Sequence, residues 1–161
     1  MQNVRPSIFI GSSVEGLPIL EALNVLLDRS CEVVPWTTLF EPSEFTLESL
    51  ETRIDDFDFG CMILTPDDVT QSRGKMSQSP RDNLILELGL IIGSLGRKRS
   101  FAVCNRGAKT KLPTDLAGFN LLAYDPPQSG TFESALGATS IKIRNAIERL
   151  GVRAPTRKRV G

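Results

Sequence analysis

The run Phe59–Leu64 limits the possible folds of this chain more than any other stretch. All of its residues are apolar, with no alternation between apolar and polar positions. A strand that is apolar on both faces must be covered on both faces, and this is typical of central strands in parallel sheets. Thr65 and Pro66 end the run, because a proline cannot donate to the ladder of a central strand. The run therefore predicts a parallel β-sheet with helices on both sides.

Other apolar runs alternate along the chain with segments of helical periodicity. Strands are expected at residues 7–10, 31–36, 59–64, 101–104 and 119–124. Helices are expected at residues 17–27, 46–57, 80–93 and 132–150, with polar loops at 37–45, 65–79 and 105–115. Alternating strands and helices with short connections form parallel sheets with right-handed crossovers. We therefore predict a flavodoxin-like α/β fold, with a sheet of about five parallel strands and helices on both faces.

The length and composition of the chain indicate one globular domain. Of its 161 residues, 40% are hydrophobic and 24% are charged. We expect this domain at residues 1–152, followed by a basic tail or truncated linker at 153–161. No apolar stretch approaches the roughly 18 residues that span a bilayer, and the N-terminus lacks a signal-peptide pattern, so a cytoplasmic location is expected. The formal net charge of +0 attracts neither nucleic acid nor an anionic membrane, and neither is an expected partner.

Histidine is absent from the sequence, which removes several kinds of catalytic site. Ser-His-Asp and Cys-His mechanisms both need it. Cys31, Cys61 and Cys104 are widely spaced within or beside apolar runs, so buried free thiols are expected. A zinc site normally uses Cys and His ligands, and neither a metal nor a bound cofactor is expected here. Catalysis would have to use carboxylates, amides, hydroxyls, arginines or backbone groups.

Glu87 is the strongest catalytic candidate, because it interrupts a helix that is otherwise apolar. Around this carboxylate, residues 84–92 are apolar on every face, the pattern of a helix that is buried all round. Ser79 and Pro80 mark the helix start, which puts Glu87 about two turns inside and too deep to be a cap. A buried carboxylate must lose its charge, find a partner or face a cavity. Asn83, four residues earlier, is expected on the same face, while a basic partner from elsewhere would make Glu87 structural.

The carboxyl ends of the strands are the expected binding edge, because parallel α/β sheets bind their ligands there. Gly11, Ser12 and Ser13 follow the first strand, where a helix N-terminus can bind a phosphate. A tight turn with a serine cap is the alternative reading of this segment. Trp36 and Phe40 lie at or just past the end of the second strand, where they can stack on a planar base or fill the core.

Further polar candidates follow the third strand. Asp67 can contact a ligand or be a solvated loop residue, and Arg81 can bind a phosphate or pair with Asp82. With Glu87 as the catalytic residue, the candidate substrate-binding residues are Gly11, Ser12, Ser13, Trp36, Phe40, Asp67, Arg81, Asp82 and Asn83.

A series of short motifs, in order and nearly without gaps, resembles one family over roughly residues 6–125. The motifs are Phe9-Ile10-Gly11-Ser12-Ser13-Val14-Glu15-Gly16, Trp36-Thr37, Thr65-Pro66-Asp67-Asp68, Pro80-Arg81-Asp82-Asn83 with Glu87-Leu88-Gly89, and Lys111-Leu112-Pro113 with Asp115-Leu116-Gly118. They are similar to the bacterial TIR-like predicted nucleotide-binding domains. Those domains occur as effectors of antiphage cyclic-nucleotide signalling systems of the CBASS and Pycsar types, including TIR-STING fusions.

The resemblance implies that the chain is an NAD+ hydrolase, with NAD+ as substrate and nicotinamide and an ADP-ribose product. It also implies that Glu87 is the essential glutamate of the family. Better-known TIR hydrolases have a tryptophan four residues before this glutamate, whereas this chain has Asn83, so Trp36 or Phe40 would supply the stacking ring. The resemblance further implies activation by self-association through TIR-TIR contacts. A second-messenger sensor domain, which this chain does not contain, would then be a partner.

The implied reaction suits a protein without histidine. Nicotinamide leaves NAD+ as a neutral molecule and needs no general acid, whereas ordinary glycosidases need two carboxylates. One carboxylate is enough to stabilise the positive charge that develops on the ribose. Two alternatives stay open from the sequence: a non-catalytic nucleotide-binding or TIR-TIR assembly module, and a nucleoside deoxyribosyltransferase.

Overall fold

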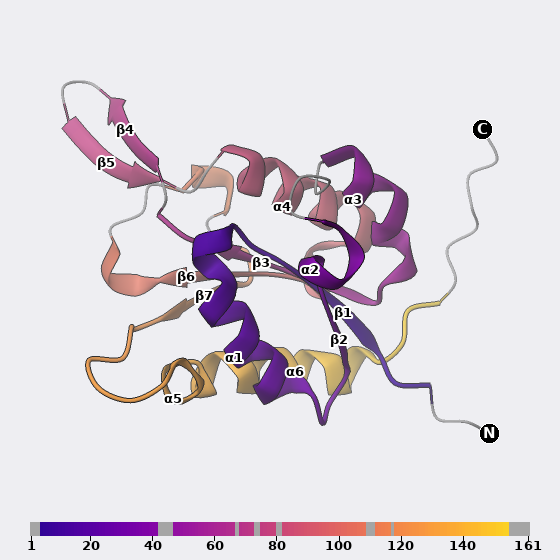
Figure 1. Cartoon of the computed structure of the whole chain (residues 1–161). Coiled ribbons are helices and arrows are strands. Elements are labelled where there is room, and N and C mark those ends of the chain that lie inside the picture. Colours follow the sequence, from indigo (N-terminus) through magenta and orange to yellow (C-terminus); the bar gives the residue numbers. More distant parts are fainter. Residues whose placement is uncertain are drawn as a thin grey trace.

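Five parallel strands form the central sheet of the molecule (Figure 1). The computed structural model describes residues 4–41, 47–66, 68–72, 75–79, 82–108, 112–116 and 118–154, with the backbone alone at 68–72, 75–79 and 82. The strands of the sheet are β1 (Ser7–Gly11), β2 (Glu32–Pro35), β3 (Phe59–Leu64), β6 (Ser100–Asn105) and β7 (Leu121–Tyr124). Their order is β2-β1-β3-β6-β7, which confirms the predicted flavodoxin-like α/β fold.

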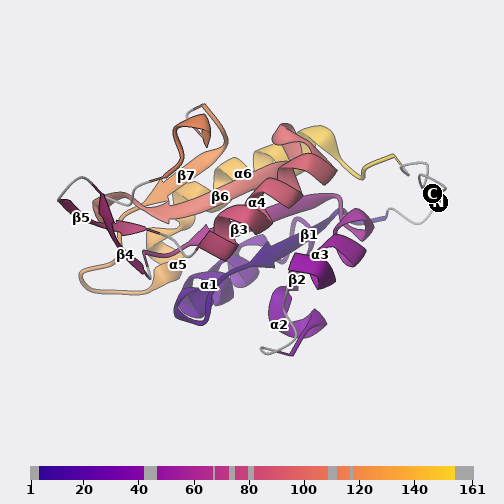
Figure 2. The ribbon, with the colours of Figure 1, turned by 90° about the horizontal axis from the view of Figure 1, so that it is seen from above.

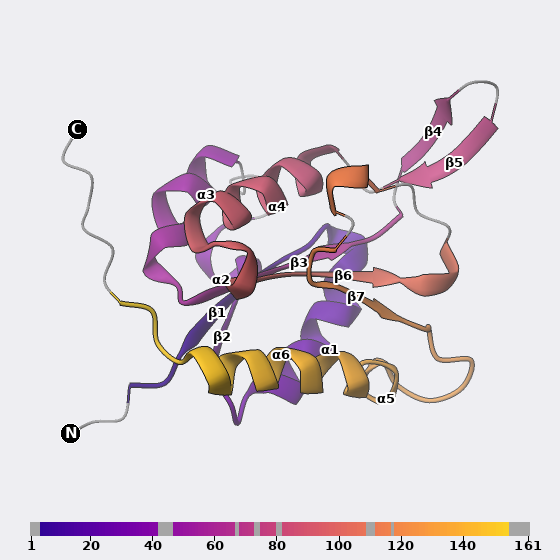
Figure 3. The same ribbon diagram turned by 180° about the vertical axis from the view of Figure 1, so that it is seen from behind.

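Helices cover both faces of this sheet, as the views from the front and from behind show (Figures 1 and 3). One face carries α1 (Leu17–Leu27), α5 (Phe132–Ala135) and α6 (Gly137–Leu150). The other carries α3 (Leu47–Arg53) and α4 (Asp82–Leu95), and α4 lies along β3 and β6 (Figure 2). Every residue of β3 is buried, because this strand has a neighbour on each side and helices on each face. The apolar run that predicted the fold is therefore its centre.

Two local predictions were wrong. Trp36 does not end the second strand, because Pro35 closes β2 and Trp36–Leu39 form the short helix α2. Part of the expected loop at 65–79 is an antiparallel hairpin of β4 (Asp68–Ser72) and β5 (Lys75–Ser79), which projects beyond the sheet (Figure 1). Its strands pair with each other and not with the central sheet, so this polar segment forms a separate two-stranded sheet instead of a loop.

The helices also differ from the prediction in detail. The expected helix at 46–57 is α3 followed by a 3-10 turn at Ile54–Asp56. The last helix is broken between α5 and α6, where Leu136 is fully buried. Within α4, Leu88 and Ile91 are buried, but Leu86 is 58% exposed. The expectation that this helix is buried all round is therefore wrong, because α4 packs on the sheet with one face and leaves the other open.

The three cysteines are buried free thiols, as predicted. Burial raises the pKa of Cys31 to about 11 and that of Cys61 to about 12. Burial also raises the pKa of Cys104. Within the described ranges, no helix has the length and apolar character that crossing a bilayer requires.

Candidate functional site

Glu87 lies inside α4 with its side chain turned to the protein interior, and the residue is 5% exposed. Among the described residues, its Oε2 is the one buried side-chain nitrogen or oxygen without a hydrogen-bond partner. Desolvation by burial raises the pKa of this carboxyl to about 7. Near neutral pH the group is therefore poised between its acid and its anion, and a nearby positive charge would favour the anion.

The packing of α4 on β3 places Glu87 along the sheet. Ile91 fits against Gly60, where an added Cβ would lie 2.5 Å from the Ile91 Cγ2 atom. Glu87 is one turn before Ile91, about 6 Å nearer the carboxyl ends of the strands. A strand advances about 6.6 Å in two residues, so Glu87 is level with Met62. The carboxyl group therefore lies in the half of the molecule where the sequence predicts the binding edge.

Gly11 is required here by packing. A Cβ on Gly11 would lie 2.5 Å from Sδ of Met62, its partner across the strand pair β1 and β3. Met62 faces the same side of the sheet as Gly60, because they are two residues apart in one strand. The missing side chain at Gly11 thus makes room for Met62 on the face covered by α4. The space beside this glycine is therefore occupied by the thioether of Met62.

Ser12 and Ser13 join the ends of three segments through their hydroxyl groups. The Trp36 indole N–H donates to Ser12 Oγ at 3.0 Å, and Ser13 Oγ pairs with Thr65 Oγ1 at 2.8 Å. Both serines are buried. The tight turn of the alternative reading is present, because Ser13 precedes a 3-10 turn, but the Ser13 side chain makes no capping bond to it. These two hydrogen bonds hold the ends of β1 and β3 and the start of α2 together.

The two aromatic candidates differ in exposure. Trp36 is 3% exposed and belongs to the hydrophobic core, which agrees with the alternative that it fills space. Its indole N–H is used within the protein, and its ring face is covered in this conformation. Phe40 directly follows α2 and is half-buried against the same core.

The remaining predicted residues lie at or before the start of α4. Asn83 is exposed whereas Glu87 is buried, so the amide and the carboxyl do not share one buried environment. Asp82 begins α4, and the structure describes its backbone. Asp67 and Arg81 lie outside the described residues. The structure thus brings together Gly11, Ser12, Ser13 and Trp36 around the ends of β1 and β3.

Two residues of this region were missed by the sequence analysis. Thr65 bonds Ser13, and Met62 packs over Gly11. A signal for Thr65 was available, since it directly follows the most apolar strand at the predicted binding edge. Met62 carried no such signal, because a methionine inside an apolar run is read as core. Within the described part of the chain, no group of three or more potential metal ligands occurs.

Comparisons with known proteins agree with one another. A family model described as "CAP12/Pycsar effector protein, TIR domain" matches residues 7–126. The chain is 40% identical over 147 residues to the Pycsar effector protein PaPycTIR of Pseudomonas aeruginosa, which covers 89% of this chain and 48% of that protein. It is 40% identical over 149 residues to CD-NTase-associated protein 12 of Flavobacterium daejeonense, covering 91% and 45% respectively. The chain thus spans about half the length of the curated relatives it matches.

Proposed function

The chain belongs to the family of CAP12/Pycsar effector TIR domains, and on that premise we propose that it is an NAD+ hydrolase. It would cleave the bond between nicotinamide and ribose, as the effector domain of an antiphage defence system. Glu87 is the proposed catalytic residue. The proposal extends the resemblance of the sequence to a specific reaction.

The observation that carries this proposal is the buried, unpartnered Oε2 atom of Glu87. A buried carboxyl oxygen without a hydrogen-bond partner suits a reaction in which the substrate supplies the opposite charge. In NAD+ cleavage, positive charge develops at C1' of the ribose as nicotinamide leaves. The attraction between this charge and Glu87 is stronger in an apolar interior than in water.

The proposed reaction balances with water as its co-reactant. The bond from C1' to the pyridinium nitrogen breaks, and both electrons stay on that nitrogen, which becomes neutral. Water adds its oxygen to C1' and loses a proton, so the products are ADP-ribose, nicotinamide and a proton. Glu87 becomes ionised beside the cationic substrate, stabilises the ribosyl cation and is positioned to take up the proton.

The other residues predicted to contact the substrate differ in how far their exposure and contacts support that role. Phe40 is half-buried and Asn83 is exposed, so both are accessible to a ligand. Trp36 would act indirectly, through its hydrogen bond to Ser12. The assignments that remain sequence-based proposals are Asp67, Arg81 and Asp82.

The test is nicotinamide release from NAD+ by the whole chain, with Glu87→Gln as the key variant. Glu148→Gln is the matched control, because Glu148 is an exposed glutamate on α6, across the sheet. Glu87→Gln should lower turnover by about 10²–10³-fold, the usual effect of removing one electrostatic contact to a transition state. Glu148→Gln should leave it unchanged. Equal turnover in the two variants would remove Glu87 from the mechanism.

Self-association is the second part of the proposal. Leu86 on α4 is 58% exposed and Leu47 on α3 is 42% exposed, and these two helices pack side by side. Exposed apolar side chains on neighbouring helices favour contact with another protein surface, here proposed to be a second copy of the domain. Activity should therefore rise with protein concentration and with artificial clustering, under the control of a sensor domain for a second messenger.

The same assay separates the alternatives. If a clustered sample releases no nicotinamide, the hydrolase proposal fails and the domain is better described as a non-catalytic assembly module. If deoxynucleosides are turned over and NAD+ is not, the deoxyribosyltransferase alternative replaces it.

A further inference from the structure

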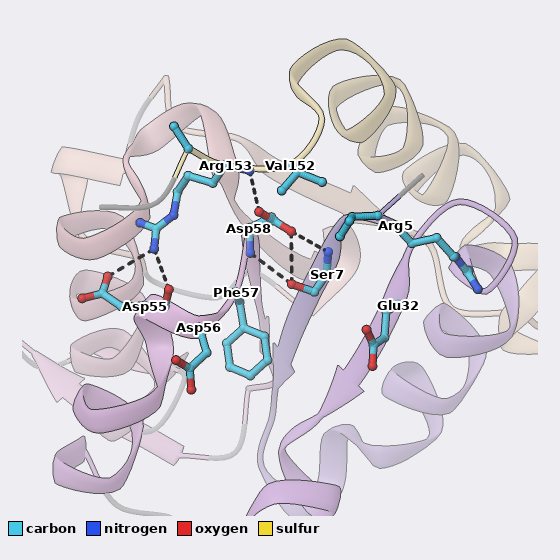
Figure 4. Close-up of a pocket in the computed structure, with 11 residues that line it drawn as sticks. Arg5, Ser7, Glu32, Asp55, Asp56, Phe57, Asp58, Val152 and Arg153 are labelled. Atoms are coloured by element: carbon cyan, nitrogen blue, oxygen red, sulfur yellow. Dashed lines mark hydrogen bonds and ion pairs between the residues drawn. The ribbon is translucent and has the colours of Figure 1, made fainter. Parts of the chain in front are cut away.

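A cavity of about 360 Å³, lined by both polar and apolar side chains, lies at the amino ends of the strands, at the edge opposite the candidate site (Figure 4). Its walls come from the segment that enters β1, from the turn before β3 and from the segment that follows α6. Segments far apart in the sequence therefore meet at this edge. The contacts around the cavity are hydrogen bonds and ion pairs, and two side chains make most of them.

Asp58 is the first of these side chains. Its Oδ2 accepts hydrogen bonds from the backbone N–H and the hydroxyl group of Ser7, at 2.9 and 3.2 Å. Its Oδ1 accepts from the backbone N–H of Arg153 at 2.5 Å. One carboxylate thus joins the start of β1 and the segment after α6 to the start of β3 (Figure 4).

The guanidinium group of Arg153 is the second. It donates to the backbone oxygen of Ser94 at 3.1 Å and to that of Asp55 at 2.8 Å, and it pairs with the Asp55 carboxylate at 3.4 Å. The side chain is 16% exposed. Ser94 lies in the last turn of α4, where carbonyl groups lack helical partners and a positive charge is favourable. Arg153 therefore caps the helix that carries Glu87.

The neighbouring Arg99 ties the end of α6 to the same edge. Its guanidinium donates to the backbone oxygens of Leu150 and Gly151, at 3.0 and 2.8 Å, and stacks 4.8 Å from the centre of the Phe59 ring. Arg99 thus fixes the chain as far as Gly151. From Arg153 onward, the contacts of Asp58 and Arg153 fix it.

We propose that Asp58 and Arg153 form a clamp through which the segment following α6 controls the position of α4, and with it Glu87. Ser94 is seven residues from Glu87, about 10 Å along one continuous helix. A rigid helix transmits a shift of one end to the other. The contacts of the clamp are polar and border an open cavity, so a pull or a partner acting on the segment after Arg153 can exchange them without breaking the apolar core. The clamp stands on these contacts alone, and its effect on turnover rests on the proposed function.

The first test compares Arg153→Gln with Arg53→Gln by amide hydrogen exchange on the whole chain. Arg53 is the matched control, because it is 45% exposed and it pairs with Asp56, three residues later in the chain, rather than with a described residue of α4. In Arg153→Gln, amides in the last turns of α4 should exchange roughly three- to tenfold faster, while those of α1 stay unchanged. Arg53→Gln should match the original chain throughout. Unchanged exchange in α4 of the Arg153 variant would overturn the clamp.

The second test asks whether the effect reaches Glu87. We expect the carboxyl titration of Glu87, followed by NMR, to move toward that of an ordinary glutamate in Arg153→Gln, because a loosened α4 admits water. If the Glu87 titration is unchanged in Arg153→Gln, Arg153 only caps the end of α4, and the proposed coupling between Arg153 and Glu87 is overturned. If Arg153→Gln does not fold, Arg153→Lys takes its place, since a lysine keeps the charge but cannot hold Ser94 and Asp55 together.

Nicotinamide release, measured on the same samples, keeps the two proposals separate. A faster exchange of α4 with a lower turnover supports both. If the original chain itself does not cleave NAD+, the hydrolase proposal fails, while the exchange and titration results still decide the clamp.

Discussion

The charged groups near the two edges of the sheet differ in whether they have hydrogen-bond partners. At the amino edge, Asp58 and Arg153 are matched to their neighbours, donor to acceptor. At the carboxyl side, Glu87 is buried more deeply but its Oε2 has no donor. Matched groups at an edge where chain segments converge stabilise the fold. A buried oxygen without a donor costs stability, and such groups cluster at functional sites.

A large loss of stability is expected from a substitution at the matched edge. Asp58→Ala removes the acceptor of three hydrogen bonds and should lower the free energy of unfolding by about 2–3 kcal/mol, measured by urea denaturation. Asp125→Ala is the control, because its ion pair with Arg106 is exposed at both ends and should be worth less than about 1 kcal/mol. Equal losses of unfolding free energy in the two variants would mean that the hydrogen bonds of Asp58 contribute no more than an exposed ion pair.

The pH dependence of stability tests the unmatched side. The pKa of Glu87 is raised to about 7 in the folded protein, so between its unfolded value and 7 the folded state binds more protons. This group therefore contributes full stability below pH 4.5, and the contribution is lost as pH rises through 7. A shift of this pKa from 4.5 to about 7 corresponds to a difference on the order of 3 kcal/mol in the free energy of unfolding between the two limits. Glu87→Gln should remove this part of the pH dependence, and an identical profile in that variant would show that Glu87 is paired.

Gly11 sharpens the comparison, because its role is packing beside the candidate site. Gly11→Ala should cost about 1–2 kcal/mol, since the new Cβ must displace the Met62 thioether. Gly89→Ala lies in the middle of α4, where an added Cβ would have no atom within 4 Å, and it should instead stabilise by about 0.5–1 kcal/mol. Thermal unfolding of both variants measures the difference. If Gly11→Ala is more stable than the original chain, the Met62 side chain can move away from the new Cβ at no cost in free energy.

A small effect is expected at Trp36. Trp36→Phe keeps the aromatic ring but removes the N–H that bonds Ser12, which should cost about 1 kcal/mol in denaturant unfolding. If Trp36 acts on the substrate only through Ser12, this variant should also raise KM for NAD+ more than it lowers kcat. A change in kcat alone would argue for direct contact of the ring with the reacting part of the substrate.

The strands of the sheet were predicted well because each of them can be recognised from its own short run of apolar residues. The six apolar residues of β3 can be satisfied only by a covered central strand. The apolar residues around Glu87 predicted its burial correctly, although the helix is not buried on every face. The hairpin β4–β5 was missed because its polar residues show neither apolar alternation nor a defined turn. The open face of α4 was missed because Leu86 is apolar and yet exposed, which composition alone does not reveal.

The candidate site was predictable in position but not in detail. Strand ends placed Ser12, Ser13 and Trp36 on one edge, and the structure brings them together. Their partners depend on side-chain geometry across three separate segments, which no local pattern encodes. The opposite edge gave no signal either, because Arg153 and Asp58 are 95 residues apart in sequence and each resembles an ordinary surface charge.

The buried thiols have a practical consequence for studying this domain. Cys31 and Cys61 are shielded, with pKa values raised to about 11 and 12, so at neutral pH almost none of either is the reactive thiolate. A maleimide dye should therefore not react with these native cysteines while the chain is folded. A single cysteine placed at the exposed Leu86 would accept the label without any prior removal of the natural ones. Fluorescence from that position would report directly on the helix that carries Glu87.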